Sequence, residues 1–173
     1  MSKTGRILVH TGDGKGKTTA ALGTAFRAAG HGQKVGIVQF MKGKWTYGEI
    51  LAVGRFSNIT LSRMGSGFTW EKEGLDEDRE LAARAWATCK ELAASGEYDL
   101  LVMDELNYAV DYGFLDVEEV VRFLREKPAA LSVIITGRRA KQEIIDAADT
   151  VTEMRAVKHA FRSGTRAQKG IEY

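Results

Sequence analysis

The sequence predicts an α/β fold for a single domain at residues 1–173, with a mostly parallel sheet and helices on both faces. Short apolar runs alternate along the chain with segments in which apolar residues recur at helical spacing. This alternation is typical of parallel strands joined by crossover helices. The length of 173 residues suits one domain, and no repeat, low-complexity tract or linker interrupts the pattern. Such sheets bind ligands at the carboxyl ends of their strands, so the segments after the strands should carry the chemistry.

The first half of the chain contains three expected strands and one helix. Residues 6–10, "RILVH", form the first strand candidate. The next segment, 18–29, has helical spacing and should end at Gly30, because glycine commonly terminates helices. Residues 34–40, "KVGIVQF", are an apolar strand candidate, and 58–64 are a weaker one.

The longest expected helix spans residues 75–94. Three acidic residues, 76 to 78, fall in its first turn, where negative charge suits the helix dipole. Its apolar positions recur at helical spacing: Leu75, Ala82, Ala85, Trp86, Cys89, Leu92 and Ala93. Cys89 is the only cysteine, which excludes an internal disulfide and any paired-cysteine metal or redox motif.

The second half continues the alternation. Residues 98–103 form a nearly continuous apolar run, as in a strand covered on both faces. Residues 118–125 read as a helix, with Pro128 just past its end. A buried strand is expected at 131–136, and the last strand at 149–154.

Composition indicates a globular, soluble protein, with 44% hydrophobic and 28% charged residues. No stretch approaches the roughly 20 apolar residues that span a bilayer, and "MSKTGRILVH" lacks a signal-peptide pattern. We therefore expect a cytoplasmic protein without membrane contacts. The net charge of +2 is too small to indicate nucleic-acid binding. The C-terminal stretch is more basic and is expected to be a solvated tail: Arg155, Lys158, Arg162, Arg166 and Lys169 stand against Glu172.

A glycine- and lysine-rich segment, "TGDGKGKTT" at 11–19, joins the first strand to the first helix. Its glycines allow successive amides to face phosphate oxygens, and the helix N-terminus adds partial positive charge. Lys17 would reach the outer phosphates, and Thr18 would bind magnesium. The strict pattern has glycine where Thr11 stands, so this loop is a variant; a plain flexible turn is the alternative, which its strand–helix context disfavours. The expected nucleotide contacts are Gly12, Asp13, Gly14, Lys15, Gly16, Lys17, Thr18 and Thr19. The fold is therefore expected to be P-loop NTPase-like, of the RecA-like kind.

Other strand ends supply further candidates. The apolar run at 98–103 ends in Asp104 and Glu105, and an acid at that place is the usual magnesium-side partner of a phosphate loop. Asp104 would hold the metal directly or through water, and Glu105 would do the same or act as a base. Both can instead be ordinary strand-end acids. Arg138 follows another strand and either contacts phosphate or lies at the surface, while Gln39 ends the second strand within reach of ATP.

These parts indicate binding of MgATP or MgGTP and leave the reaction open. ATP is favoured because no NKxD-like guanine-reading motif is apparent, and no lid-like arginine cluster suggests a small-molecule kinase. Phe68 and Trp70 lie in a glycine-rich loop, where they either anchor the loop on the core or contact a ligand. The histidines lack metal-ligand spacing and are expected at the surface or as caps: His10, His31 and His159.

From about Arg6 to Tyr173 the chain resembles the ATP:corrinoid adenosyltransferases of the bacterial P-loop type, also called cob(I)yrinic acid a,c-diamide or cob(I)alamin adenosyltransferases. Five segments carry the resemblance, in order: "TGDGKGKTTAALGTAFRAAGHGQKVGIVQFMKG", "GSGFTW", "DLLVMDELNYA", "VIITGR" and "VKHAFRSGTRAQKGIEY". The shifted phosphate loop resembles that family's own version. The aromatic and C-terminal segments are more specific than the loop.

The resemblance implies transfer of the 5′-deoxyadenosyl group of ATP to the reduced cobalt of a corrinoid, in adenosylcobalamin biosynthesis or corrinoid salvage. Inorganic triphosphate leaves whole, and its charge would be neutralised by the loop amides, Lys17 and magnesium at Thr18. Phe68 and Trp70 resemble aromatics that crowd the corrinoid and expel its axial ligand, which makes cobalt(II) easier to reduce. Lys17, Glu105 and this aromatic pair are the expected catalytic residues.

Implied substrates are ATP with Mg²⁺ and a corrinoid, which is cobalamin, cobinamide or cobyrinic acid diamide. We expect a homodimer, with an electron-donating flavoprotein as a candidate partner. Two other interpretations remain open: a P-loop kinase or ATPase that cleaves at the γ-phosphate, and a nucleotide-dependent switch that binds a protein partner through the GFTW loop. Formation of triphosphate, of ADP, or of neither separates the three.

Overall fold

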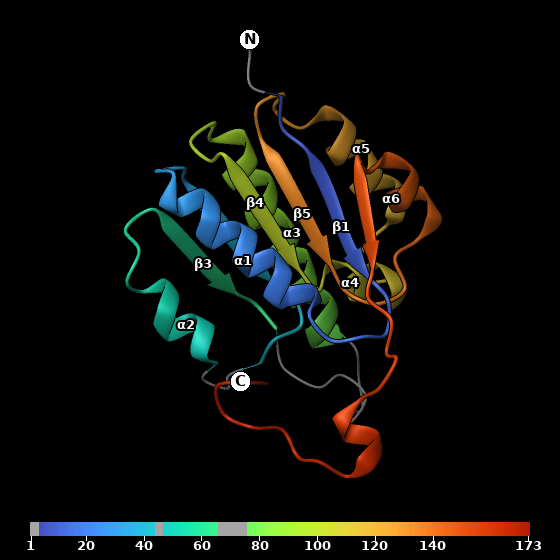
Figure 1. Ribbon diagram of the computed structural model, residues 1–173. Coiled ribbons are helices and arrows are strands. Elements are labelled where there is room, and N and C mark those ends of the chain that lie inside the picture. Colours follow the sequence, from blue (N-terminus) through green and yellow to red (C-terminus); the bar gives the residue numbers. More distant parts are fainter. Residues whose placement is uncertain (1–3, 44–46, 66–75) are drawn as a thin grey trace.

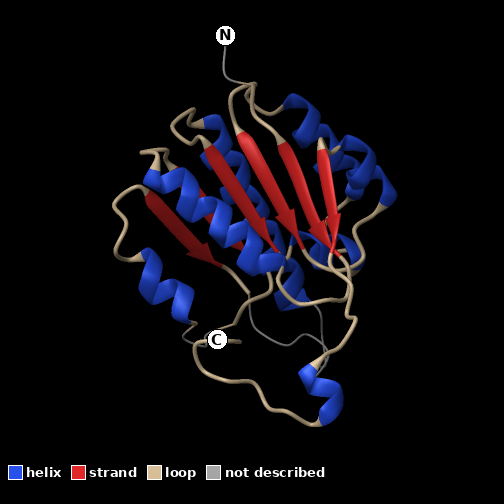
Figure 2. Ribbon diagram, in the orientation of Figure 1, coloured by secondary structure: helices blue, strands red, loops and turns tan. Residues whose placement is uncertain are grey.

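A computed structural model describes residues 4–43, 47–65 and 76–173 (Figure 1). Six strands form one sheet in the order β3-β2-β4-β5-β1-β6, and every neighbouring pair is parallel (Figure 2). The strands are β1 (Ile7–Thr11), β2 (Val35–Gln39), β3 (Ile59–Arg63), β4 (Leu100–Asp104), β5 (Ser132–Thr136) and β6 (Thr150–Glu153). The expected α/β class, parallel sheet and strand positions are confirmed, with strand ends within two residues of the prediction.

Helices cover both faces of the sheet (Figure 1). α1 packs on one face, while α3, α4, α5 and α6 pack on the other, and α2 lies against β3. The helices are α1 (Lys17–Gly30), α2 (Gly48–Val53), α3 (Asp76–Ala94), α4 (Leu106–Asp111), α5 (Val117–Glu126) and α6 (Gln142–Ala147), followed by the 3₁₀ turn η2 (Ala160–Ser163). Across the part of the chain that the structure describes, no helix is long and apolar enough to cross a membrane.

The two hydrophobic layers follow from the alternation of side chains along each strand. In β4, Leu101 and Met103 pack in the layer of α3, whereas Leu100 and Val102 pack in the layer of α1. Both layers are buried, which explains why the strand reads as a continuous apolar run. Burying one such side chain contributes about 1.5–3 kcal/mol, so the sheet's central strands fix the fold.

Three short helices, α2, α4 and α6, were not predicted from the sequence. Each has six residues, which is fewer than two turns, so its apolar residues show no helical period. The long helix α3 is confirmed, with Ala82, Ala85, Trp86 and Cys89 buried on its inner face; Leu75 lies outside the described residues. Burial also raises the pKa of the Cys89 thiol, which agrees with an inert core residue.

The histidine prediction is wrong for His10 and right for His31. His10 is 8% exposed near the end of β1, and its Nδ1 lies 3.3 Å from the carbonyl oxygen of Lys17. Its burial follows from the position of β1 between β5 and β6, with helices over both faces. His31 forms the C-cap of α1, and His159 immediately precedes η2.

Candidate functional site

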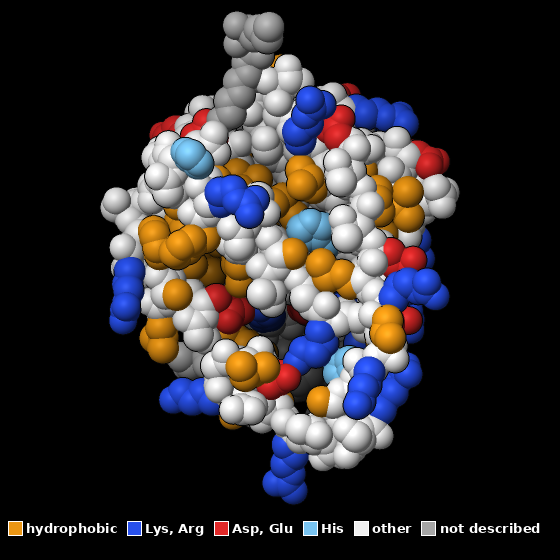
Figure 3. All heavy atoms as spheres, in the orientation of Figure 1, with side chains coloured by type: hydrophobic (Ala, Val, Ile, Leu, Met, Phe, Trp, Pro, Cys, Tyr) orange, Lys and Arg blue, Asp and Glu red, His pale blue; other side chains and the backbone are white. Residues whose placement is uncertain are grey.

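The carboxyl ends of four parallel strands meet at one edge of the sheet. Thr11 ends β1, Gln39 ends β2, Asp104 ends β4 and Thr136 ends β5. The register pairs Gln39 with Asp104, and His10 with Thr136. Residues far apart in the sequence therefore come together at the edge where such sheets bind ligands. In the space-filling view, acidic and basic side chains gather below this edge, between the sheet and the C-terminal segment (Figure 3).

The phosphate loop follows β1 and is closed around the side chain of Lys17. The Lys17 Nζ atom donates hydrogen bonds to the carbonyl oxygens of Gly12, at 2.7 Å, and Gly14, at 2.6 Å. Gly12 and Gly16 have φ values of 91° and 110°, which favour glycine. The Gly14 amide, which was expected to face phosphate, donates instead to the Met154 carbonyl oxygen at 2.6 Å. The segment after β6 therefore holds the loop.

Two other basic side chains lie at this loop: Arg138 reaches it from the segment after β5, and Lys15 belongs to it. The Arg138 Nε atom is 3.8 Å from Asp13 Oδ1, so the arginine reaches the loop, as the phosphate-contact alternative requires. Burial, and then the neighbouring Arg138 charge, lower the pKa of Lys17. The Lys15 ammonium lies 2.5 Å from Glu172 Oε1, so the C-terminal segment returns to the loop rather than being wholly solvated. The five basic residues of that segment are exposed, as expected.

Asp104 is the fully buried centre of the polar cluster. Its Oδ1 accepts hydrogen bonds from the hydroxyls of Thr18 and Thr136, each at 2.7 Å. Its Oδ2 accepts one from Gln39 Nε2 at 3.1 Å and lies 3.3 Å from Lys42 Nζ. The structure thus brings together Thr18, Gln39 and Asp104, which the sequence suggested, and adds Thr136 and Lys42, which it did not. Thr136 ends β5 and Lys42 follows β2, so their places at the carboxyl ends of strands were the available signal.

Glu105 follows in a left-handed backbone conformation, with φ 67° and ψ 19°. This conformation costs a non-glycine residue about 1 kcal/mol, and such outliers cluster at functional sites. The Glu105 amide donates to Thr136 Oγ1 at 2.9 Å, which helps to hold the turn. Burial and then the Asp104 charge raise the pKa of Glu105 to about 7, although Lys42, Lys17 and Arg138 oppose the rise.

The oxygen atoms of this cluster fit magnesium. Thr18, Asp104 and Glu105 offer hard oxygen ligands of the kind that Mg²⁺ prefers. Gln39 Oε1 is buried and has no hydrogen-bond partner among residues 4–43, 47–65 and 76–173, and a metal-bound water would satisfy it. Within the same ranges, no group of three or more His, Cys, Asp or Glu side chains is placed to hold a metal ion without other ligands. Two carboxylates suit Mg²⁺ that is also held by nucleotide phosphates.

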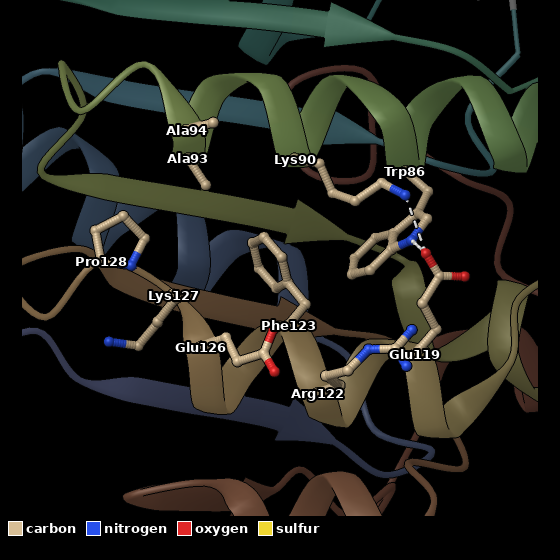
Figure 4. A pocket seen from close by; sticks show the side chains of 10 residues that line it. All are labelled: Trp86, Lys90, Ala93, Ala94, Glu119, Arg122, Phe123, Glu126, Lys127 and Pro128. Carbon is tan, nitrogen blue, oxygen red and sulfur yellow. Dashed lines mark hydrogen bonds and ion pairs between the residues drawn. The ribbon is translucent and has the colours of Figure 1, made fainter.

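The remaining predicted residues are less informative. Thr19 is exposed at the start of α1. Phe68 and Trp70 lie outside the described residues. A groove of about 550 Å³ opens between α3 and α5, where Trp86 and Phe123 form part of its wall (Figure 4). Among the residues that the structure describes, none of those predicted to bind nucleotide or metal lines this groove, so it is separate from the cluster around Asp104.

Comparison with known proteins identifies the relatives of this chain. The family model described as ATP:corrinoid adenosyltransferase BtuR/CobO/CobP matches residues 3–173. A corrinoid adenosyltransferase of Escherichia coli (strain K12) is 47% identical over 169 residues, which cover 98% of this chain and 86% of the relative. A corrinoid adenosyltransferase of Pseudomonas aeruginosa is 46% identical over 170 residues, with 98% and 84% covered.

Two solved structures are similar in fold alone. A KaiC-like protein from Pyrococcus horikoshii has a TM-score of 0.53 and 16% sequence identity, and the match covers 90% of this chain and 74% of the other. The cytoplasmic domain of EssC has a TM-score of 0.56 and 12% identity, with 95% and 34% covered. These similarities agree with the P-loop NTPase-like fold.

Proposed function

The chain belongs to the ATP:corrinoid adenosyltransferase family, and on that premise we propose that it transfers the 5′-deoxyadenosyl group of ATP to the reduced cobalt of a corrinoid. Triphosphate is the second product. The observation that best supports an ATP site in this chain is the hydrogen bond between Thr18 and Asp104, 2.7 Å long, which joins the phosphate loop to the acidic strand end.

The reaction needs charge stabilisation more than proton transfer. An electron pair on cobalt(I) forms the bond to the 5′-carbon, while the electrons of the broken carbon–oxygen bond pass to triphosphate. Lys17 and Arg138 meet at the phosphate loop and would stabilise that leaving group. The attack on carbon releases no proton, so the reaction requires no base. Glu105 is therefore proposed as a metal ligand, which is one of the two roles that its sequence position suggested.

Thr18, Asp104 and Glu105 would hold Mg²⁺, which would supply additional positive charge beside the triphosphate. Gln39 donates to Asp104 through Nε2, and its free Oε1 is placed to accept from a metal-bound water. Thr136 donates to Asp104 and accepts from the Glu105 amide, so it fixes both acids at once. These contacts orient the acidic pair before ATP binds.

The corrinoid side of the proposal rests on the family resemblance. Phe68 and Trp70 would crowd the corrinoid and expel its axial ligand while cobalt is still cobalt(II). A flavoprotein would donate the electron in the cytoplasm, and the enzyme would act as a homodimer. The pathway is adenosylcobalamin biosynthesis or corrinoid salvage, with cobalamin, cobinamide or cobyrinic acid diamide as the acceptor.

A spectroscopic assay tests this function. The protein is incubated with ATP, MgCl₂ and chemically reduced corrinoid, and the absorption spectrum of the corrin ring is followed. We expect the cobalt(I) spectrum to be replaced by that of an adenosylated corrinoid only when ATP is present. No spectral change with cobalamin, cobinamide and cobyrinic acid a,c-diamide, each tested in turn, would contradict the proposal.

A further inference from the structure

A lysine that is mostly, though not fully, buried stands beside the acid that is proposed to bind magnesium. The side chain of Lys42 is 12% exposed, and its Nζ lies 3.3 Å from Asp104 Oδ2. The same ammonium lies 2.6 Å from Glu49 Oε1 and 5.0 Å from the centre of the Tyr47 ring. Lysine is almost never buried unless it is paired, so this pairing indicates a built site rather than an incidental surface contact.

The fold places Lys42 there through the order of the strands. β2 lies beside β4, and their register pairs Gln39 with Asp104 at the carboxyl edge. The chain leaves β2 after Gln39, so Lys42 comes over the end of the neighbouring strand. Glu49 stands in the first turn of α2, at the start of the helix that packs on β3. Lys42 therefore pairs with carboxylates from two different elements, Asp104 at the end of β4 and Glu49 in α2.

The charges of this triad favour an ammonium ion. Two carboxylates, Asp104 and Glu49, lie within ion-pair distance of the Lys42 nitrogen and favour its charged form. In the metal-free protein Lys42 therefore supplies the positive charge that the buried Asp104 carboxylate requires. Mg²⁺ bound by the same carboxylate would meet repulsion from this ammonium, because the two cations would share one acid.

We propose that Lys42 is a positioning residue for the metal. In the metal-free protein its ammonium pairs with Asp104 and holds that carboxylate in place. When Mg²⁺ binds Asp104, the ammonium releases this carboxylate and stays paired with Glu49. The inference rests on the proposed magnesium role of Asp104. It assigns a regulatory pair, Lys42 and Glu49, that sets how much Mg²⁺ the enzyme needs. A lysine that only anchored the loop would affect stability without any consistent effect on metal affinity.

The triad predicts opposite effects for its two outer members. Lys42→Met removes the competing charge, so the Mg²⁺ concentration that supports half-maximal ATP binding should fall about tenfold. Glu49→Gln leaves the ammonium with Asp104 as its carboxylate partner, so that concentration should rise about tenfold. Lys42→Met should also unfold at a lower temperature without metal and gain more from added Mg²⁺, because the metal replaces the missing counter-charge.

Lys34 offers a matched control at the other end of β2. It pairs with Glu97, and its Nζ lies 4.9 Å from the centre of the Tyr98 ring. Lys34 thus has the same kinds of partners as Lys42, but its side chain is 42% exposed and it lies at the opposite end of β2 from the proposed metal ligands. Lys34→Met should leave the magnesium requirement at the wild-type value.

The experiment uses corrinoid-free protein, in which ATP has no acceptor. ATP binding is measured by calorimetry over a series of free Mg²⁺ concentrations for wild type, Lys42→Met, Glu49→Gln, Lys34→Met and Asp104→Asn. Circular dichroism in EDTA establishes that each variant is folded. Opposite shifts for Lys42→Met and Glu49→Gln support the proposal, and equal, absent or same-direction shifts overturn it.

The Asp104→Asn variant separates this inference from the proposed function. An unchanged magnesium requirement in that variant would remove the metal role from Asp104, and the inference would fail with it. A raised requirement in Asp104→Asn, without diverging shifts in the other two variants, overturns the role of Lys42 alone. If Lys42→Met does not fold without metal, the Glu49→Gln titration decides: a raised requirement supports the proposal and any other result overturns it.

Discussion

Replacing Glu105 with glutamine should remove a pH-dependent loss of stability from the metal-free protein. Burial and the Asp104 charge raise the pKa of Glu105 from its ordinary value of 4.5 to about 7 in the folded state. Between these values the folded chain binds more protons than the unfolded chain, so the free energy of unfolding decreases as the pH rises. The stabilisation is fully present below pH 4.5 and is lost as the pH passes through about 7.

The size of the effect follows from the same two values. The interval from 4.5 to about 7 is roughly 2.5 pH units, which corresponds to about 3 kcal/mol at 1.36 kcal/mol per unit. About 2.5 kcal/mol of this change should fall between about pH 5 and 8. For a chain of this size, such a change corresponds to about 5–10 °C in melting temperature.

Denaturant unfolding in EDTA, followed by circular dichroism, measures the effect for wild type and Glu105→Gln. The stability of wild type relative to the variant should decrease by about 2.5 kcal/mol as the pH rises from about 5 to 8. Glu97→Gln is the matched control. Hydrogen bonding to Lys34 lowers the pKa of Glu97, so this group stays ionised across the range. Parallel stability curves for wild type and Glu105→Gln would refute the electrostatic account of this residue.

Three further predictions concern the proposed reaction. Lys17→Ala should reduce adenosylation by about 10²–10³-fold at saturating ATP, because a charge facing the leaving group is lost; near-normal turnover would show that Lys17 has another role. Asp104→Asn should raise the Mg²⁺ concentration needed for half-maximal adenosylation, and an unchanged magnesium titration would transfer the metal role to Glu105. Phe68→Ala and Trp70→Ala should fail with cobalt(II) and a weak reductant yet retain much activity with prepared cobalt(I), whereas equal losses in both assays with a lowered melting temperature would indicate a packing role.

Local patterns account for the parts of the site that the sequence predicts. The phosphate loop is a continuous motif, and its lysine and threonine occupy fixed positions in it. Asp104 ends an apolar run, and parallel strands end at one edge, so its approach to Thr18 could be expected and is confirmed at 2.7 Å. The strand and helix assignments depend on the same kind of periodicity, which is strong in α3 and in β4.

Long-range geometry explains what the sequence does not predict. Lys42 and Thr136 are single common residues without a surrounding motif, and they meet Asp104 because β4 lies between β2 and β5. The contact between Lys15 and Glu172 joins residues 157 positions apart, and no local pattern marks it. His10 is buried because β1 is an inner strand, a fact that depends on the strand order rather than on the residue itself.

The phosphate-containing product tests the central claim most directly. Protein, ATP, MgCl₂ and cobalt(I) corrinoid are incubated together, and the products are identified by phosphorus NMR while the corrin spectrum is recorded. The account predicts that intact triphosphate appears in step with the adenosylated corrinoid and that ADP does not accumulate. ADP and phosphate without an adenosylated corrinoid would contradict it and would indicate a P-loop kinase or ATPase instead.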